Sequence, residues 1–232
     1  MEDIIDTFGE GLKNLFKNPI LFAPMGLLLL IAFISAFILG FALENVLTAV
    51  PSSESFLYIS IIYLAYIAVL LILSSYLMAG LVGMSKEAVA FGKTNFSDMF
   101  KYGNKFALRL ILASIILLIL YLIAAIFWAP TVYVFMNAGY TIEGIFDVMI
   151  NNPDAFLSII KTLAAPALIG LLLTIIYTIV LTLFFYFVTY AIVVDDISVI
   201  SAYKKSYAVL KQNFWKVLAF IILVWLLTIV FT

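Results

Sequence analysis

The sequence predicts an all-α polytopic membrane protein, with about five visible transmembrane helices and amphipathic helices at the cytoplasmic interface. Apolar residues make up 66% of the 232 residues and charged residues 11%, whereas a typical soluble domain carries roughly a quarter charged residues. The mean hydropathy is +1.25. Five apolar runs reach or approach the roughly 20 residues that cross a bilayer core of about 30 Å. A soluble fold is therefore excluded, and we expect a single membrane domain over residues 1–232.

The N-terminal third predicts an interfacial helix followed by two spans. Residues 1–18 place apolar side chains on one helical face and acids before lysines on the other, which suits the helix dipole and a membrane interface. This stretch has no basic start and no small-residue cleavage site, so we do not expect a signal peptide. Residues 20–43 form the first predicted span and residues 56–84 the second. We expect residues 44–55 to be a short polar connection.

The middle of the chain predicts a basic loop, a third span and a long outer region. Residues 85–105 carry four lysines, and either Asn95 or Ser97 is placed to cap a short helix there. The third span covers residues 106–129. Residues 131–161 are polar on balance but keep apolar residues at helical spacing. We expect this region to lie against the bilayer or to cap the bundle.

The C-terminal part predicts two further spans and a lysine-bearing interfacial helix. Asparagines and a proline at residues 151–153 break the outer region before the fourth span, which covers residues 163–194. Residues 195–225 read as an amphipathic helix that turns at Asn213, next to an aromatic pair, and then enters the membrane. The fifth span, residues 214–232, is barely long enough to cross.

The placement of basic residues predicts the orientation in the membrane. Eleven of the 12 lysines and arginines lie on one side of the predicted spans, and only Lys161 falls on the other. Loops rich in lysine and arginine stay in the cytoplasm. We therefore expect an inner or plasma membrane protein with its N-terminus in the cytoplasm and with residues 131–161 outside.

A weak internal repeat is visible in the pattern. Three lysine-bearing amphipathic stretches each end near an asparagine and lead into a span. The stretches are residues 8–20, 96–106 and 203–215, with Asn18, Asn104 and Asn213. The predicted units are residues 1–84, 85–194 and 195–232. The third unit is incomplete, so we expect a sixth span to be missing from this sequence. The alternative is that lysines simply precede spans in most such proteins.

Two stretches combine small residues with regularly placed aromatic and polar residues. The first contains Gly80, Gly83, Ala88, Gly92, Thr94, Phe96, Asp98 and Phe100. The second contains Asp196, Ser198, Ala202, Ser206, Lys211, Asn213, Phe214 and Trp215. This pattern resembles the membrane domain found fused to glycerophosphoryl diester phosphodiesterases and its stand-alone prokaryotic relatives of unknown function. The resemblance implies a six-span helical domain and gives no catalytic residue to carry over. This chain departs from it by lacking a sixth span and a phosphodiesterase domain.

The sequence offers little catalytic chemistry. It has no Cys and no His, which removes thiol nucleophiles, Cys/His zinc sites and haem ligation by histidine. No charged residue lies in the middle of a span, which argues against pumps and ion-driven transporters. Asp195 and Asp196 suit a helix-start and dipole role, with cation binding as the alternative. Glu143, Asp147 and Asp154 suit a solvated face, with a metal site as the alternative. We predict no cofactor, and a net charge of −1 gives no case for nucleic acid.

A stripe of hydroxyl groups marks the fourth predicted span. Thr174, Thr178, Thr182 and Tyr186 recur every four residues. Small hydroxyl residues at this spacing let helices pack closely and hydrogen-bond. The alternative is a polar pathway for a small solute or lipid headgroup, facing Ser74, Ser75 and Tyr76 of the second span. Gly80 and Gly83 on that span predict a close helix contact rather than a hinge.

The function predicted from these features is that of a non-enzymatic scaffold or accessory component. It would assemble with itself, with an unidentified protein partner or with membrane lipid, and Lys204, Lys205 and Lys211 are the candidate contacts for anionic headgroups. The alternative for these lysines is a role in topology alone. The second functional hypothesis is a passive channel or permease. An enzyme is the third, and it would need a soluble hydrolase as partner.

Overall fold

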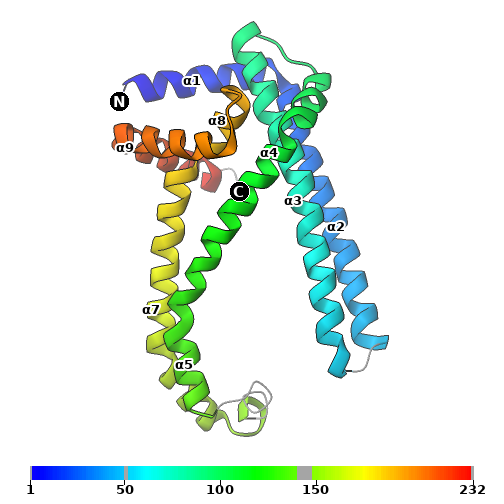
Figure 1. The fold of residues 1–232 in the computed structure, drawn as a ribbon, viewed down its shortest axis with the longest axis vertical. Helices are drawn as coiled ribbons and strands as arrows, with labels where there is room; N and C mark the ends of the chain where they lie inside the picture. The colour runs from blue at the N-terminus through cyan, green and yellow to red at the C-terminus, as the bar shows by residue number, and fades with distance from the viewer. Residues whose placement is uncertain (1, 50–51, 140–147, 231–232) are drawn as a thin grey trace. The chain divides into compact units, whose positions relative to one another are not determined.

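The computed structural model describes residues 2–49, 52–139 and 148–230 (Figure 1), and these residues form helices and no strands. The all-α prediction is confirmed. The elements are α1 (Glu2–Lys17), η1 (Pro19–Leu21), α2 (Phe22–Ala49), α3 (Ser52–Phe91), α4 (Phe96–Leu122), η2 (Ile123–Trp128), α5 (Ala129–Asn137), α7 (Pro153–Phe185), α8 (Val188–Val194) and α9 (Val199–Val230). The predicted outer acids Glu143 and Asp147 lie outside the described residues.

Within the described residues, five helical stretches are long and apolar enough to cross a membrane, as the sequence predicts. They are Pro19–Val46, Leu57–Phe91, Phe96–Asn137, Asp154–Val194 and Val199–Val224. The chain divides into two compact units. Unit 1 comprises Met1–Ile115 and Phe185–Thr232, and unit 2 comprises Ile116–Phe184.

Two predicted loops are largely helical. The polar connection at residues 44–55 is wrong in extent, because α2 continues to Ala49 and α3 resumes at Ser52. Asn45 does not interrupt α2, since its side chain donates to the Phe41 carbonyl at 2.8 Å. The basic loop at residues 85–105 is also wrong in extent: α3 reaches Phe91 and α4 begins at Phe96. Polar residues there occupy helix faces, and polarity alone did not distinguish a helix face from a loop.

The short turn between α3 and α4 explains where those helices end. Gly92 has a φ of 73°, a left-handed conformation that glycine adopts without strain and that terminates helices. Asn95 precedes α4, and its backbone N–H donates to Asp98 Oδ2 at 2.9 Å, which is half of a capping box. The helix predicted to start here is not short, because α4 runs on without a break into the third span.

Two predicted breaks are confirmed. Asn152 Oδ1 accepts a hydrogen bond of 3.1 Å from the Ala155 N–H, so the helix before it ends and α7 starts with a side-chain cap. Asn213 has φ −129° and ψ 32°, which kinks α9 where the lysine-bearing part meets the fifth span.

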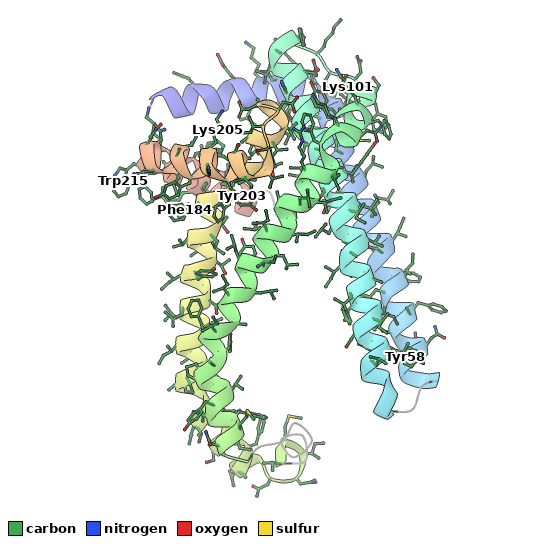
Figure 2. The ribbon with its side chains drawn as sticks, viewed as in Figure 1. Tyr58, Lys101, Phe184, Tyr203, Lys205 and Trp215 are labelled. Carbon is green, nitrogen blue, oxygen red and sulfur yellow. The ribbon has the colours of Figure 1, made fainter. Side chains whose placement is uncertain are left out.

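The core of unit 1 lies where α3, α4, α8 and α9 meet. Phe106 is 1% exposed, and Ile192 and Ala202 are fully buried beside it. Tyr203 of α9 (Figure 2) donates from its hydroxyl to the Ala113 carbonyl of α4 at 2.6 Å. These contacts fix α8 and the first half of α9 against α4, and they position the charged groups described next.

Gly80 and Gly83 make the close helix contact that the sequence predicts. A Cβ on Gly80 would lie 2.9 Å from the Met99 carbonyl oxygen, and one on Gly83 would meet the Tyr102 ring. Both neighbours belong to α4. The absence of side chains at these glycines is therefore what lets α3 and α4 cross so closely.

Candidate functional site

A charged joint connects α8 to α9 in unit 1. Asp196 lies between these helices with a φ of 54°, an uncommon conformation for a non-glycine residue. Its Oδ2 is 2.7 Å from Lys105 Nζ and its Oδ1 is 2.7 Å from Arg109 Nη1. Lys105 and Arg109 are four residues apart on α4, so they share one helix face. One carboxylate is therefore held by two cations.

The rest of the joint adds two further helices to this contact. Lys205 of α9 (Figure 2) pairs with Asp195 at 2.8 Å. Lys86 of α3 donates to the Val194 carbonyl at 2.7 Å, which satisfies a free carbonyl at the negative end of α8. The joint thus links α3, α4, α8 and α9. Both neighbouring aspartates bind basic side chains of the same chain, in keeping with a structural role.

The two cations change the titration of Asp196. Hydrogen bonds from Lys105 and, to a smaller extent, from Arg109 hold the pKa of this carboxyl below its ordinary value of 3.8, because they favour its ionised form. The side chain is exposed to water, which screens the ion pairs. The joint is therefore an ordered electrostatic contact that salt and acid weaken.

We expect Asp196→Asn to increase hydrogen exchange across residues 195–205, since Lys105 and Arg109 lose their shared carboxylate. The wild-type contact is complete above pH 3.8 and is lost as the pH falls below it, because the pKa is lowered in the paired state. The variant should show no such acid step, and Glu10→Gln, at an exposed site outside the joint, should leave the step intact. If wild type and Asp196→Asn lost protection equally at the same acidic pH, this role of the joint would be refuted.

The three predicted lipid-contact lysines do not share one environment. Lys205 belongs to the joint. Lys204 and Lys211 are exposed on α9, and neither forms an ion pair with a described residue. Anionic lipid contact at these positions stays a prediction.

The hydroxyl stripe contributes to helix packing inside unit 2. Thr174 accepts from the Trp128 indole at 3.1 Å and donates to the Gly170 carbonyl at 2.8 Å. Thr182 lies 3.3 Å from the Tyr121 hydroxyl. A Cβ on Gly170 would lie 2.9 Å from the Phe127 carbonyl oxygen. The glycine and threonine, four residues apart, thus form a close, hydrogen-bonded helix contact.

The other stripe residues are used differently. Thr178 is half-buried and makes no hydrogen bond to a described residue. Tyr186 follows the end of α7 and belongs to unit 1, where its ring lies 6.4 Å from those of Tyr190 and Phe220. Ser74 and Tyr76 of the second span hydrogen-bond within unit 1, to the Leu71 carbonyl and to Asn104 respectively. Thr174 and Thr182 therefore take part in helix contacts within unit 2, and a polar pathway along the stripe stays a prediction.

A second polar cluster was not predicted. Tyr102 donates to Glu87 at 2.5 Å, and Lys101 (Figure 2) lies 3.5 Å from the same carboxylate. Thr94 Oγ1 donates to Asp98 at 3.1 Å. These contacts fix the turn between α3 and α4. In the sequence, Glu87 and Tyr102 lie on either side of the Gly92 turn. Their contact could not be predicted from this spacing, because it depends on how α3 and α4 cross.

Over the described ranges 2–49, 52–139 and 148–230, no group of three or more acidic, histidine or cysteine residues is placed to hold a metal ion.

Comparison with known proteins identifies one family. A family model described as a domain of unknown function (DUF7847) matches residues 3–232. No curated protein matches the chain. No solved structure matches it either.

Proposed function

This chain belongs to the DUF7847 family, and we propose that it is a non-catalytic scaffold or accessory component of the membrane that assembles with copies of itself and with lipid. We also propose that its N-terminus lies in the cytoplasm of an inner or plasma membrane, on the strength of the lysine distribution. The resemblance to the phosphodiesterase-associated membrane domain stays part of this proposal. No residue of the chain is assigned a catalytic role.

The observation that carries self-assembly is the outer face of α2. Ala36 and Gly40 are exposed four residues apart, and a Cβ on Gly40 would meet no atom within 4 Å. Phe33, three positions before Ala36, and Phe37, one position after it, are 75% and 76% exposed. Small residues at this spacing allow a second helix to approach closely, and adjacent aromatic rings add contact area. Because lipid tails are as apolar as leucine, exposure alone does not drive association; the shape of this face favours it.

We expect the double substitution Ala36→Leu and Gly40→Leu to weaken self-association about tenfold, the change that about 1.4 kcal/mol of lost packing produces. Single-molecule photobleaching of labelled protein in supported bilayers measures the distribution of copies per particle. The control is Ala65→Leu with Ala68→Leu, which adds similar bulk to exposed positions of α3. A wild-type protein that is monomeric at every density, and that purifies without lipid, would refute the proposal.

The second hypothesis, a passive channel or permease, is less well supported. It was motivated by the hydroxyl stripe, and Thr174 and Thr182 are hydrogen-bonded to neighbouring helices of unit 2. Hydroxyl groups engaged in helix contacts give less support to a polar path than unengaged ones. The scaffold is for this reason proposed first.

A further inference from the structure

An apolar cavity of about 440 Å³ lies beneath α1 in unit 1, within the range of volumes that hold small ligands. The residues around it include Gly11 and Leu15 of α1, Leu21 of η1, Ala88 and Val89 of α3, and Phe220 of α9. Among the described residues that line it, only Asn14 and Ser85 are polar, and the Ser85 hydroxyl donates to the Leu81 carbonyl at 2.8 Å. The cavity therefore suits a hydrocarbon chain rather than a polar solute.

The amphipathic character of α1 predicts the depth of the cavity in the membrane. α1 is amphipathic, and the cavity is lined by one of its faces. An amphipathic helix of this kind lies at the boundary between headgroups and acyl chains. A hydrocarbon chain in the cavity would consequently leave its headgroup level with the polar residues of α1.

Two exposed lysines flank a contact between the end of α1 and the turn after α3, the two helices that line much of the cavity. The Asn18 side chain donates to the Gly92 carbonyl at 3.4 Å. Each of these two residues has a lysine next to it in the sequence. Lys17 directly precedes Asn18, and Lys93 directly follows Gly92. Both lysines are exposed, and neither forms an ion pair with a described residue. Lys13 lies one helical turn before Lys17.

From this juxtaposition we propose that the chain binds an anionic phospholipid, with an acyl chain in the cavity beneath α1 and its phosphate at Lys17 and Lys93. The apolar lining selects the hydrocarbon, and the unpaired cations select the charge of the headgroup. The site deepens the proposed function and rests on it, since it names the lipid class that the scaffold holds. It is separate from Lys204, Lys205 and Lys211.

Gly11 allows a direct test. It lines the cavity, and a Cβ there would meet no atom within 4 Å, so the side chain in Gly11→Leu starts in open space and adds bulk at the cavity wall. Gly9 lies on the same helix, also has open space around a Cβ, and does not line the cavity. Gly9→Leu is therefore a matched control that gains the same helix propensity and the same bulk.

The experiment is native mass spectrometry of purified protein mixed with equal amounts of phosphatidylglycerol and phosphatidylcholine. Wild type and Gly9→Leu should each carry one phospholipid, with a clear preference for phosphatidylglycerol. Gly11→Leu should lose this adduct. Lys17→Gln with Lys93→Gln should keep a lipid but lose the preference, by about fivefold for each lysine, since one lysine near a membrane surface contributes about 1 kcal/mol.

Two results would overturn the site. One is an equal adduct in Gly11→Leu and Gly9→Leu, and the other is a wild type that binds both lipids equally or neither. Photobleaching of the same samples separates this failure from that of the proposed function. A protein that self-associates but has no such adduct refutes the lipid site alone.

Discussion

Gly83→Ala is expected to destabilise the protein by about 1–3 kcal/mol or more, the usual cost of overpacking a well-packed contact. The added Cβ would occupy the position of the Tyr102 ring. That ring cannot easily move, because its hydroxyl donates to Glu87 at 2.5 Å and the ring stacks on Phe106, with ring centroids 6.1 Å apart. Reversible unfolding in mixed detergent micelles measures the loss.

The matched control is Gly9→Ala in α1, where the same methyl group meets nothing within 4 Å. This control should be stabilised by up to about 1 kcal/mol, since alanine favours a helix over glycine. Adding Tyr102→Ala to Gly83→Ala should recover part of the lost stability by removing the clash. If Gly83→Ala and Gly9→Ala behave alike, the crossing of α3 and α4 is looser than described.

The sequence allowed prediction of features that depend on local pattern. Helical spacing and apolar runs fix where α1 and the five spans lie, and Asn152 and Asn213 interrupt helices for reasons contained in a few neighbouring residues. The close helix contact at Gly80 and Gly83 was also predictable, because small residues in a span predict close packing. Loop boundaries were less accurate, since a polar helix face and a polar loop have the same composition.

Contacts between distant residues could not be predicted in this way. Lys105 and Asp196 are 91 residues apart in sequence, and their pairing depends on how α4 meets the turn between α8 and α9. The stripe predicted hydroxyl groups on the fourth span, but it gave no indication that Trp128 and Tyr121 would be their partners. Charge and hydroxyl patterns indicate that a partner exists, and only the fold identifies it.

The asparagine repeat illustrates both cases. Asn18 has φ −123° and ψ 68°, and Asn213 has φ −129° and ψ 32°, so each marks a non-helical joint between an amphipathic helix and a span. Asn104 lies inside the continuous helix α4, where its side chain instead accepts from the Tyr76 hydroxyl at 3.1 Å. The three-unit repeat stays a prediction, with a matching joint in the first and third units and none in the second.

Phe106→Ala is expected to cost about 3–5 kcal/mol, the largest loss among single truncations of the core of unit 1. The side chain is 1% exposed and contacts both the apolar cluster and the charged joint. Lys105 Nζ lies 4.8 Å from the ring centroid and Arg109 Cζ lies 5.6 Å from it. The ring therefore makes cation–π interactions with the two basic side chains that bind Asp196. Phe106→Leu keeps most of the volume and should cost less than about 1.5 kcal/mol.

The same residue tests whether packing and charge act together. If the ring orients Lys105 and Arg109, the effects of Phe106→Leu and Asp196→Asn on unfolding should not add, since the second change removes a contact that the first has already loosened. Additive effects would mean that the core and the charged joint are independent, with the cations held by their own helix. A non-additive result would mean that the two functions of α4 are coupled. The packing of α4 against α3 and α8 would then also position Lys105 and Arg109, which hold the start of α9.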